Sequence, residues 1–513
     1  MSESVLEKRS FADIFEEIRT VYLNDNRPWI IGFSGGKDST CMVQLVWTAL
    51  SSLPAEKLTK KIYIISSNTL VEAPQIAERI TDSLDRMEKY AKKINLPIGT
   101  NLLRPPTSDT FWVRLLGLGY PAPTTMFRWC TDMLKISNAD RFIQDTVSEH
   151  GEAIVLLGMR KNESNAREQV MNLYKIEGSH LSRHSKFDQT YVYTPIEDFS
   201  SEDVWNYLLE NQNPWGEENR DLLAMYQDAN ASECPLVIDT TTPSCGGGRF
   251  GCWTCTVVDK QSYLTNLIEN DEKNEWMEVL AELRQKLKDT QEPDVWEKYR
   301  ERKRRSGRID LKTHDPKCKK CGTQNTFSAE TCKKCSEILM KHTPGPYKMD
   351  FRIQYLQDLL KGQMKIQKLK NDPDMELILE EEIHEIQRIW RMEQGDWKNT
   401  AYAIYAEITG KNLNSVQNEL GNFNEKEQEL LEKTCSDHKI PFKLVSNLLN
   451  LELKSQGANR HSKVFDKIRT ELSKEWRDVD NDEEYGKIMI ELQEKRAIKN
   501  KAKILEIDET QGE

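Results

Sequence analysis

Residues Ser34 to Thr40 have the types and spacing of a phosphate-binding loop. They read Ser-Gly-Gly-Lys-Asp-Ser-Thr and follow the apolar run Trp29–Phe33. Two glycines let the backbone turn so that successive N–H groups and the start of a helix point at one anion, while Lys37 adds charge and three hydroxyls add donors. The spacing is not that of the GxxxxGK[ST] loop. The string therefore predicts a pyrophosphate cradle between a strand and a helix.

The cysteines are a second set of residues that could do chemistry. The chain has 11 of them, and Cys245, Cys252 and Cys255 lie close together in a glycine-containing stretch. Loop thiolates at this spacing suit a metal ion or an iron–sulfur cluster whose sulfurs accept bonds from backbone N–H groups. A four-cysteine site would need one more ligand from elsewhere, with Cys234 as one candidate. Structural zinc is the alternative to a cluster here.

Another cysteine group has a different spacing. Two C-x-x-C pairs, Cys318 with Cys321 and Cys332 with Cys335, are separated by ten residues, and a glycine follows Cys321. This is the spacing of a zinc ribbon, so we expect Zn²⁺. The basic stretch 298–320 holds eleven Lys/Arg against three Asp/Glu, a local net charge of +8. Nucleic-acid contact and a solvated face both account for such a run.

The elements that must position these residues alternate along the first part of the chain. Apolar periodicity predicts strands over 29–33, 62–66 and 153–158 and helices over 11–22, 39–51, 74–94 and 133–149. This alternation predicts an α/β fold, a parallel sheet with flanking helices. Loops are expected from about 215 to 260, then a helix near 260–288, and amphipathic helices after 346.

Four segments follow from this organisation. We expect the phosphate-loop domain over 1–215, a cysteine-rich cluster-binding region with a helix over 216–300, the basic segment with zinc-ribbon-like knuckles over 301–345, and a helical C-terminal region over 346–513.

Composition excludes several classes of protein. The 513 residues include 72 Lys+Arg and 83 Asp+Glu, a net charge of −11, which excludes a chain-wide basic nucleic-acid binder. Apolar runs are far too short to span a bilayer, and residues 1–9 lack the apolar core of a secretory signal. We therefore expect a cytoplasmic protein with no membrane partner, in which disulfides are disfavoured.

Three strings together resemble the PP-loop ATP pyrophosphatase superfamily. They are Ser34–Ser39 (SGGKDS), Arg128–Lys135 (RWCTDMLK) and Gly158–Arg167 (GMRKNESNAR). The last two are similar to motifs of its phosphoadenosine-phosphosulfate reductase branch. The resemblance implies an adenine nucleotide alpha hydrolase-like fold and an enzyme that uses ATP and Mg²⁺, splits ATP between the α and β phosphates and activates an acceptor as its adenylate.

The resemblance also implies roles for individual residues. The catalytic residues would be Lys37, Asp38 and Arg160. The nucleotide-binding residues would be Ser34, Gly35, Gly36, Lys37, Asp38, Ser39, Thr40, Arg128, Lys135, Arg160, Glu163 and Arg167. The second string would bring Cys130 beside the nucleotide, so the expected [4Fe–4S] ligands are Cys130, Cys245, Cys252 and Cys255, with Cys234 in reserve. Asn68 stands where family members commonly carry Asp, so no metal or ribose role is carried over there.

Further strings are similar to the DndC family of sulfurtransferases from bacterial DNA phosphorothioation. These are Glu233–Val237, Thr242–Cys255, Arg302–Gly307 and Gly345–Tyr347. This resemblance implies an iron–sulfur ATP pyrophosphatase that works with a cysteine desulfurase and other Dnd proteins. Its product would be DNA in which sulfur replaces a non-bridging phosphate oxygen.

Three other functions stay open. A sulfonucleotide reductase needs a late catalytic cysteine, whereas Cys435 stands in an unrelated Lys-Thr-Cys-Ser context. A tRNA-thiolating PP-loop enzyme would share the activation chemistry and differ in its acceptor. A zinc-ribbon DNA-binding regulator would not be an enzyme, and for it Lys37 would be dispensable.

Overall fold

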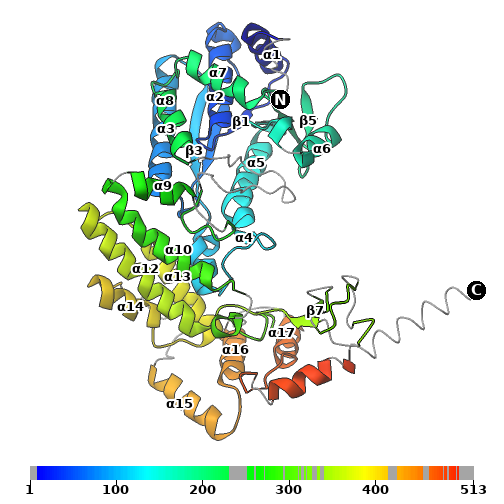
Figure 1. Ribbon diagram of the computed structural model, residues 1–513, viewed down its shortest axis with the longest axis vertical. Coiled ribbons are helices and arrows are strands. Elements are labelled where there is room, and N and C mark those ends of the chain that lie inside the picture. The colour runs from blue at the N-terminus through cyan, green and yellow to red at the C-terminus, as the bar shows by residue number, and fades with distance from the viewer. Residues whose placement is uncertain are drawn as a thin grey trace, which may run out of the picture. The chain divides into compact units, whose positions relative to one another are not determined.

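The computed structural model of the protein (Figure 1) divides into two compact units. Unit 1 comprises Met1–Arg114, Ala122–Asp289 and Asp358–Glu382, and unit 2 comprises Leu115–Pro121, Thr290–Gln357 and Ile383–Glu513. The structure describes residues 9–163, 165–229, 251–258, 262–270, 272–292, 295–309, 311–313, 317–318, 320–325, 332–335, 340–413, 425–453, 462–477, 479–481, 484–492 and 494–495.

A six-stranded sheet forms the centre of the described part of unit 1, in the order β3-β2-β1-β4-β6-β5. All neighbours in it are parallel except the pair β5 and β6. The strands are β1 (Trp29–Gly32), β2 (Ile62–Ser67), β3 (Ile98–Leu103), β4 (Ala153–Leu156), β5 (Leu181–Arg183) and β6 (Thr190–Tyr193). Parallel strands end at the same edge of a sheet, so the residues that follow β1, β2 and β4 gather there.

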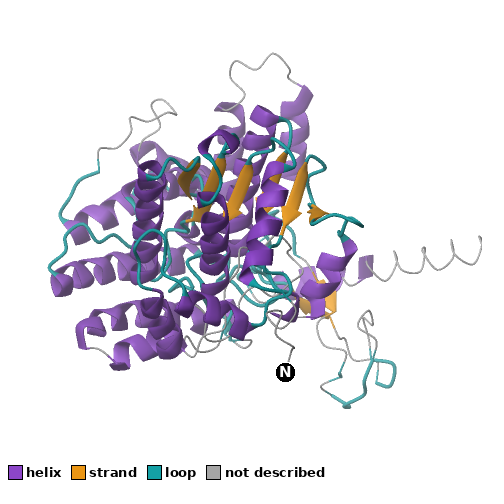
Figure 2. Ribbon diagram, turned by 90° about the horizontal axis from the view of Figure 1, so that it is seen from above, coloured by secondary structure: helices purple, strands orange, loops and turns teal. Residues whose placement is uncertain are grey.

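Helices cover both faces of this sheet (Figure 2). Side chains alternate along a strand, so Trp29 and Ile31 join one core while Ile30 joins the other. The first core includes residues of α1 (Phe11–Leu23), α2 (Lys37–Ser51), α3 (Pro74–Lys93), α7 (Ser201–Glu210) and α8 (Asn219–Ala229). The second core includes residues of α5 (Ser137–His150). Burial on both faces explains why the central strands β1 and β4 are nearly continuous apolar runs.

The remaining helices are short or lie later in the chain. They are α4 (Trp129–Thr131), α6 (Asn165–Leu173), α9 (Ser262–Asn270), α10 (Glu278–Asp289), α11 (Trp296–Tyr299), α12 (Met349–Lys370), α13 (Glu380–Ile389), α14 (Thr400–Thr409), α15 (Glu425–Asp437), α16 (Phe442–Leu453) and α17 (Ser462–Leu472). Two strands of unit 2, β7 (Leu311–Thr313) and β8 (Met340–His342), pair antiparallel.

The predicted fold class is confirmed: a parallel α/β sheet with flanking helices, a four-cysteine group and a helical C-terminal region. Some predicted elements were wrong in detail. Residues 219–229 form α8 where loops were expected, and the helix expected near 260–288 is divided into α9, a 3-10 turn and α10. The domain boundaries expected at 215, 300 and 345 stay predictions.

Two features of unit 2 concern its core and its arginines. Ile309, Val479 and Ile488 form a buried cluster. Arg352 is almost fully buried, and its guanidinium donates to the carbonyl oxygens of Tyr347 (2.7 Å) and Gly117 (2.9 Å).

None of the helices in the described part of the chain combines the length and apolar character needed to cross a membrane.

Candidate nucleotide and thiol site

The phosphate loop leaves the carboxyl end of β1 and enters α2 at Lys37. Gly35 has a φ of +74°, a left-handed conformation that favours glycine. The Ser34 N–H donates to the Ser39 hydroxyl (3.3 Å), which in turn donates to the Gly36 carbonyl (3.0 Å). The loop therefore presents a closed backbone turn and a helix N-terminus, which together suit an anion.

Charged side chains of the predicted site meet beside this loop. Arg160 Nε lies 2.5 Å from Asp38 Oδ1, and Lys37 Nζ lies 3.3 Å from Asp38 Oδ2. Lys37, Asp38 and Arg160 are only 5–6% exposed. Glu163 lies 3.9 Å from Arg160 Nη2 and forms an ion pair with Arg167. Three cations and two carboxylates leave this cluster at +1, which favours an anionic ligand.

Gly158 lets this cluster form. It follows β4, and a Cβ on it would lie 2.9 Å from the Asp38 carbonyl carbon and oxygen and 3.0 Å from the Ser39 nitrogen. Those atoms are backbone and cannot move aside cheaply. Glycine therefore allows the chain after β4 to approach the first turn of α2, which brings Arg160 to Asp38.

Burial changes the acidity of two groups in α2. It lowers the pKa of Lys37 to about 8, with Arg160 adding to the effect and Asp38 opposing it. Burial also raises the pKa of the Cys41 thiol well above its usual range. Cys41 is 0% exposed and part of the apolar core. Its thiol therefore packs rather than reacts.

Tyr226 of α8 is a site residue that the sequence analysis missed. Its hydroxyl accepts the Lys37 N–H at 3.1 Å, and a Cβ on Gly36 would lie 3.0 Å from the same oxygen. The Tyr226 ring packs edge-on against Trp205, 5.3 Å between centroids. The Tyr226 hydroxyl thus accepts the hydrogen bond from the Lys37 N–H that a bound phosphate would also accept.

The loop that contains Cys252 and Cys255, here the cysteine loop, is anchored at the same edge of the sheet. Cys252 forms an antiparallel bridge with Glu72, which follows β2, and the Trp253 N–H donates to the Val71 carbonyl at 3.0 Å. The Thr69 hydroxyl lies 3.5 Å from the Cys252 sulfur and donates to Glu72 at 2.6 Å. Because β2 pairs directly with β1, the segment after β2 that holds the cysteine loop and the phosphate loop after β1 follow neighbouring strands.

Asn68 has a local structural role. Its side-chain oxygen accepts the N–H of Leu70 at 2.8 Å, and Leu70 has a positive φ of 65°. Asn68 therefore stabilises the turn that leads to Glu72.

Helix α10 fixes the other side of the cysteine loop. Arg284 is 5% exposed, and it donates to the carbonyl oxygens of Cys255 (2.7 Å) and Val258 (2.5 Å). Lys288, one turn later, donates to the Thr256 carbonyl at 3.2 Å. The Cys252–Cys255 turn is thus held between a sheet edge and two cations, which suits a group that carries negative charge.

Two predicted residues of the second string lie near this loop. Burial raises the pKa of the Cys252 thiol, the Lys135 ammonium acts to lower it, and Cys130 acts to raise it. Cys130 and Lys135 are therefore close enough to Cys252 to interact electrostatically. The nucleotide role expected for Lys135 stays a prediction. Cys234 and Cys245 lie outside the described residues.

Arg128 lies in the turn before α4. Its Nε donates to the Thr125 carbonyl at 3.4 Å, and its buried Nη1 has no hydrogen-bond partner among the described residues. A buried guanidinium nitrogen without an acceptor is costly, and a phosphate oxygen would satisfy it. Arg160, Glu163 and Arg167 thus lie together beside the phosphate loop. The nucleotide role of Arg128 stays a prediction.

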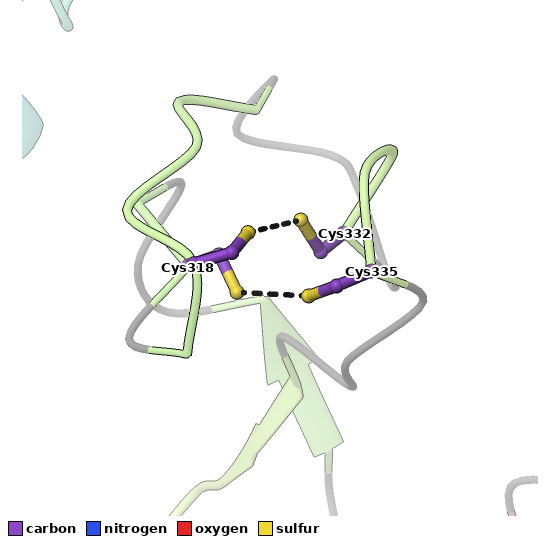
Figure 3. A group of neighbouring side chains, drawn as sticks. Cys318, Cys332 and Cys335 are labelled. Carbon is purple, nitrogen blue, oxygen red and sulfur yellow. Dashed lines mark hydrogen bonds between the residues drawn. The ribbon is translucent and has the colours of Figure 1, made fainter.

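The four cysteines of unit 2 converge as their spacing predicts (Figure 3). The sulfurs of Cys318, Cys321, Cys332 and Cys335 all lie within 4.8 Å of one another. Burial acts to raise the pKa of the Cys332 thiol, but backbone N–H groups outweigh it and lower that pKa to about 6. Four thiols gathered this closely suit a tetrahedral zinc ion or an iron–sulfur cluster.

Arginines of the basic stretch support unit 2 from within. Arg300 donates to the Gly345 carbonyl at 2.8 Å. Arg302 donates to the Val479 carbonyl at 2.8 Å, and its guanidinium lies 4.3 Å from the centre of the Tyr485 ring. Arg305 forms an ion pair with Glu393 at 2.7 Å. This stretch is thus more than a solvated face.

A sequence profile of the phosphoadenosine phosphosulfate reductase domain matches residues 28–257, which contain the phosphate loop, the second and third strings and the cysteine loop. Residues 28–257 form a phosphoadenosine phosphosulfate reductase-like domain. This reductase-like domain belongs to the PP-loop superfamily and spans most of the described sheet.

Individual relatives cover parts of the chain. An uncharacterized protein of Methanocaldococcus jannaschii is 25% identical over 198 residues, 39% of this chain and 35% of that protein. The chain thus spans about a third of the length of the curated relative it matches.

Two solved structures show weak likeness. A Candida glabrata FMN adenylyltransferase with FAD and inorganic pyrophosphate has 11% identity and a TM-score of 0.25, covering 41% of this chain and 59% of that one. The U34-tRNA thiolase NcsA of Methanococcus maripaludis with its [4Fe-4S] cluster has 14% identity and a TM-score of 0.26, covering 55% and 81%. At these TM-scores neither likeness bears on the activity of this chain.

Proposed function

We propose that this protein is an ATP-dependent sulfurtransferase of the DndC type, which adenylates a DNA backbone phosphate and exchanges one non-bridging oxygen for sulfur. A cysteine desulfurase and other Dnd proteins would supply the sulfur and complete the assembly. Zn²⁺ would occupy the four-cysteine group of unit 2 and make it a structural knuckle.

One observation carries the proposal: thiols and the phosphate loop share one edge of the sheet. The loop at Lys37 follows β1, and Cys252 bridges Glu72 just after β2, the strand beside β1. An enzyme that activates an acceptor with ATP and then delivers sulfur to it needs both functions within reach of one acceptor atom. Open α/β sheets bind ligands at this edge.

The first step is adenylation. A DNA phosphate oxygen attacks the α-phosphorus of ATP, the bond from that phosphorus to the β-bridging oxygen breaks, and pyrophosphate leaves. Lys37, Arg160 and the N-terminus of α2 stabilise the negative charge that grows on the leaving pyrophosphate. Asp38 holds both cations in place and thereby orients them.

The second step is sulfur transfer. A thiol first reduces the persulfide from the desulfurase to hydrosulfide and is itself oxidised to a disulfide. The hydrosulfide then attacks the DNA phosphorus, a phosphorus–sulfur bond forms with loss of the proton, and the bond to the adenylate oxygen breaks. AMP leaves and carries away the original DNA oxygen. Arg284 and Lys288 hold the loop of Cys252 and Cys255 while this occurs.

The residues present fit the groups that the proposal requires. Asp38 and Glu163 are the carboxylates available to Mg²⁺, which neutralises phosphate charge when bound. Cys252 is a half-buried thiol of raised pKa beside Cys130, so a metal would be needed to hold it as a thiolate. An iron–sulfur cluster there would act as a scaffold or a carrier for sulfur.

Mass spectrometry of nuclease-digested DNA and tRNA tests the proposed function. Cells would express the protein with its neighbouring genes, or with Lys37→Ala, or with the exposed Lys61→Ala as a matched control. We expect sulfur in DNA dinucleotide linkages that is lost in Lys37→Ala and retained in Lys61→Ala. Unmodified DNA together with Lys37-dependent thiolated tRNA bases would make the protein a tRNA-thiolating enzyme and contradict the DNA proposal.

Metal analysis of purified variants tests the assignment of the two thiol groups. Cys252→Ser should lose iron and sulfide and keep zinc, whereas Cys321→Ser should do the reverse, because the two cysteines lie in different units. Full iron content in Cys252→Ser would contradict the ligand set.

A further inference from the structure

Unit 2 contains a cavity of about 800 Å³ that the reaction proposed above does not use. The loop of Lys303 and Arg305, helix α16 with Lys443, and the segment around Trp476 line it. A volume of this size accommodates ligands of nucleotide size and larger. The cavity is formed entirely by residues of unit 2.

The charge of the lining differs from that of the chain. Seven Lys/Arg and five Asp/Glu line the cavity, which leaves +2, whereas the whole chain carries −11. Three of these carboxylates, Glu393, Glu471 and Glu475, already form ion pairs with lining cations. The N-terminus of α16 also lies at the cavity, with Phe442 and Lys443 in its first turn. The lining is therefore suited to an anionic group such as a phosphate.

Lys443 is the cation best placed to meet such a group. Its ammonium donates to the neutral side-chain oxygen of Gln394 at 2.8 Å. The side chain of Lys443 is exposed, but the atoms packed around its ammonium lower its pKa; Glu301 opposes this effect and Arg352 adds to it. An anion in the cavity would stabilise this charge, so ligand binding and a charged Lys443 favour each other.

A second observation indicates that the ligand also donates hydrogen bonds. Asn450 is 4% exposed and lines the cavity. Its amide nitrogen donates to the Met392 carbonyl (2.9 Å), but its oxygen is buried without a hydrogen-bond partner among the described residues. An orphaned amide oxygen would be satisfied by an amino or imino N–H, such as those on the edge of a nucleobase.

Aromatic side chains complete the lining. Trp476 is held by a bond from its indole N–H to the Glu471 carbonyl (2.9 Å), and Phe442 lies at the start of α16. Phosphate-binding cations, an unused acceptor and aromatic faces are the combination by which proteins hold unpaired nucleotides. The carboxylates of an acidic peptide would pair with the cations, but they would neither donate to the Asn450 oxygen nor stack on Phe442 and Trp476.

We propose that the cavity of unit 2 is a docking site for an unpaired nucleotide of a nucleic-acid strand. Its phosphate lies by Lys443 and the N-terminus of α16, and its base lies by Asn450 and the aromatic side chains. That this strand is the DNA acceptor rests on the proposed function. The site gives an acidic protein a local means of holding a polyanion.

Fluorescence anisotropy with a labelled single-stranded oligodeoxynucleotide tests this proposal on the full chain without ATP. We expect Lys443→Glu to weaken binding about tenfold and to reduce its salt dependence. The matched control Lys467→Glu, an exposed charge reversal on α17 outside the cavity, should change binding less than twofold. Asn450→Leu should weaken binding about threefold with unchanged salt dependence, because only the base contact is lost.

Several results would overturn the proposal. These are equal weakening by Lys443→Glu and Lys467→Glu, binding of a duplex as tight as that of the single strand, displacement of the strand by an equimolar mononucleotide, or no binding at all. Circular dichroism establishes that each variant is folded. Lys37→Ala should bind the strand normally while it forms no AMP, so failure of the docking site and failure of the proposed function are separate results.

Discussion

At the scale of single residues, Lys37 has the most direct link between environment and chemistry. Its ammonium is buried beside Asp38 and Arg160, and its pKa is lowered to about 8. The positive charge is therefore complete below that pH and is lost as the pH rises through it. Since the charge is needed for the phosphates, nucleotide affinity must fall in the same direction.

We expect the Kd for ATP to rise about tenfold between pH 7 and pH 9, as the charged fraction of Lys37 falls from about nine tenths to about one tenth. Isothermal titration calorimetry across this range measures it. Lys37→Arg keeps its charge throughout and should show a much flatter profile. A flat profile in the unaltered protein would mean that Lys37 does not contact the phosphates.

Tyr226 supports a second prediction at this scale. Its hydroxyl accepts the Lys37 N–H that a phosphate would use. Removing a competing hydrogen bond of about 0.5–1.5 kcal/mol should tighten ATP binding roughly two- to tenfold in Tyr226→Phe. Tyr207→Phe, in the same core, is the control. Weaker ATP binding in Tyr226→Phe would instead mean that the hydroxyl is itself a nucleotide ligand.

Sequence alone predicted that the loop at Ser34 to Thr40 joins a strand to a helix, but it did not predict the contact from Tyr226. The loop is a local device: its glycines, lysine and hydroxyls act within seven consecutive residues. Tyr226 lies in α8, 189 residues from Lys37 in sequence. No neighbouring residue in the sequence indicates that its hydroxyl contacts the phosphate loop. Contacts of this kind depend on tertiary packing, which sequence spacing does not encode.

At the scale of elements, α10 shows how a helix positions a loop. Leu280, Leu283 and Leu287 form its buried stripe, and Arg284 lies within that stripe. A charged residue on the apolar face of a helix was the available signal, and the sequence analysis did not use it. Burial of a guanidinium requires acceptors, and the carbonyl oxygens of the cysteine loop supply them.

Arg284→Met should therefore release the cysteine loop. We expect a loss of about 3 kcal/mol in unfolding free energy, because two charge-assisted hydrogen bonds disappear. Iron and sulfide content should fall by more than half while zinc is kept. Gln285→Ala, exposed on the same helix, is the control, with metal analysis and chemical denaturation as the measurements. Unchanged iron in a folded Arg284→Met variant would contradict a positioning role.

Strand β3 illustrates why some elements escape prediction. It contains Gly99 and Asn101, both disfavoured in strands, yet it pairs with β2 along six residues. β3 is an edge strand of the sheet, so only one of its two sides must pair with another strand. This position tolerates residues that are disfavoured in strands. The strands β1, β2 and β4 were predicted because their apolar runs are buried on both faces.

At the scale of the whole molecule, two compact units with separate cores imply two folding transitions. We expect calorimetry to resolve both. ATP should raise the midpoint of the unit 1 transition only, and Cys321→Ser should lower that of unit 2 only, since each acts on a group within one unit. Lys320→Ala, in the same knuckle, is the control. One transition that responds to both changes would contradict independent units.

Cys41 gives the reductase-like domain an internal reporter. Cys41 is 0% exposed and lies in the first turns of α2, where the phosphate loop ends. An alkylating reagent can reach it only when α2 separates from the sheet, so the labelling rate of Cys41 counts how often this domain opens. Nucleotide bound to the closed loop would slow that labelling, which makes ligand occupancy readable in the modification of a thiol that takes no part in catalysis.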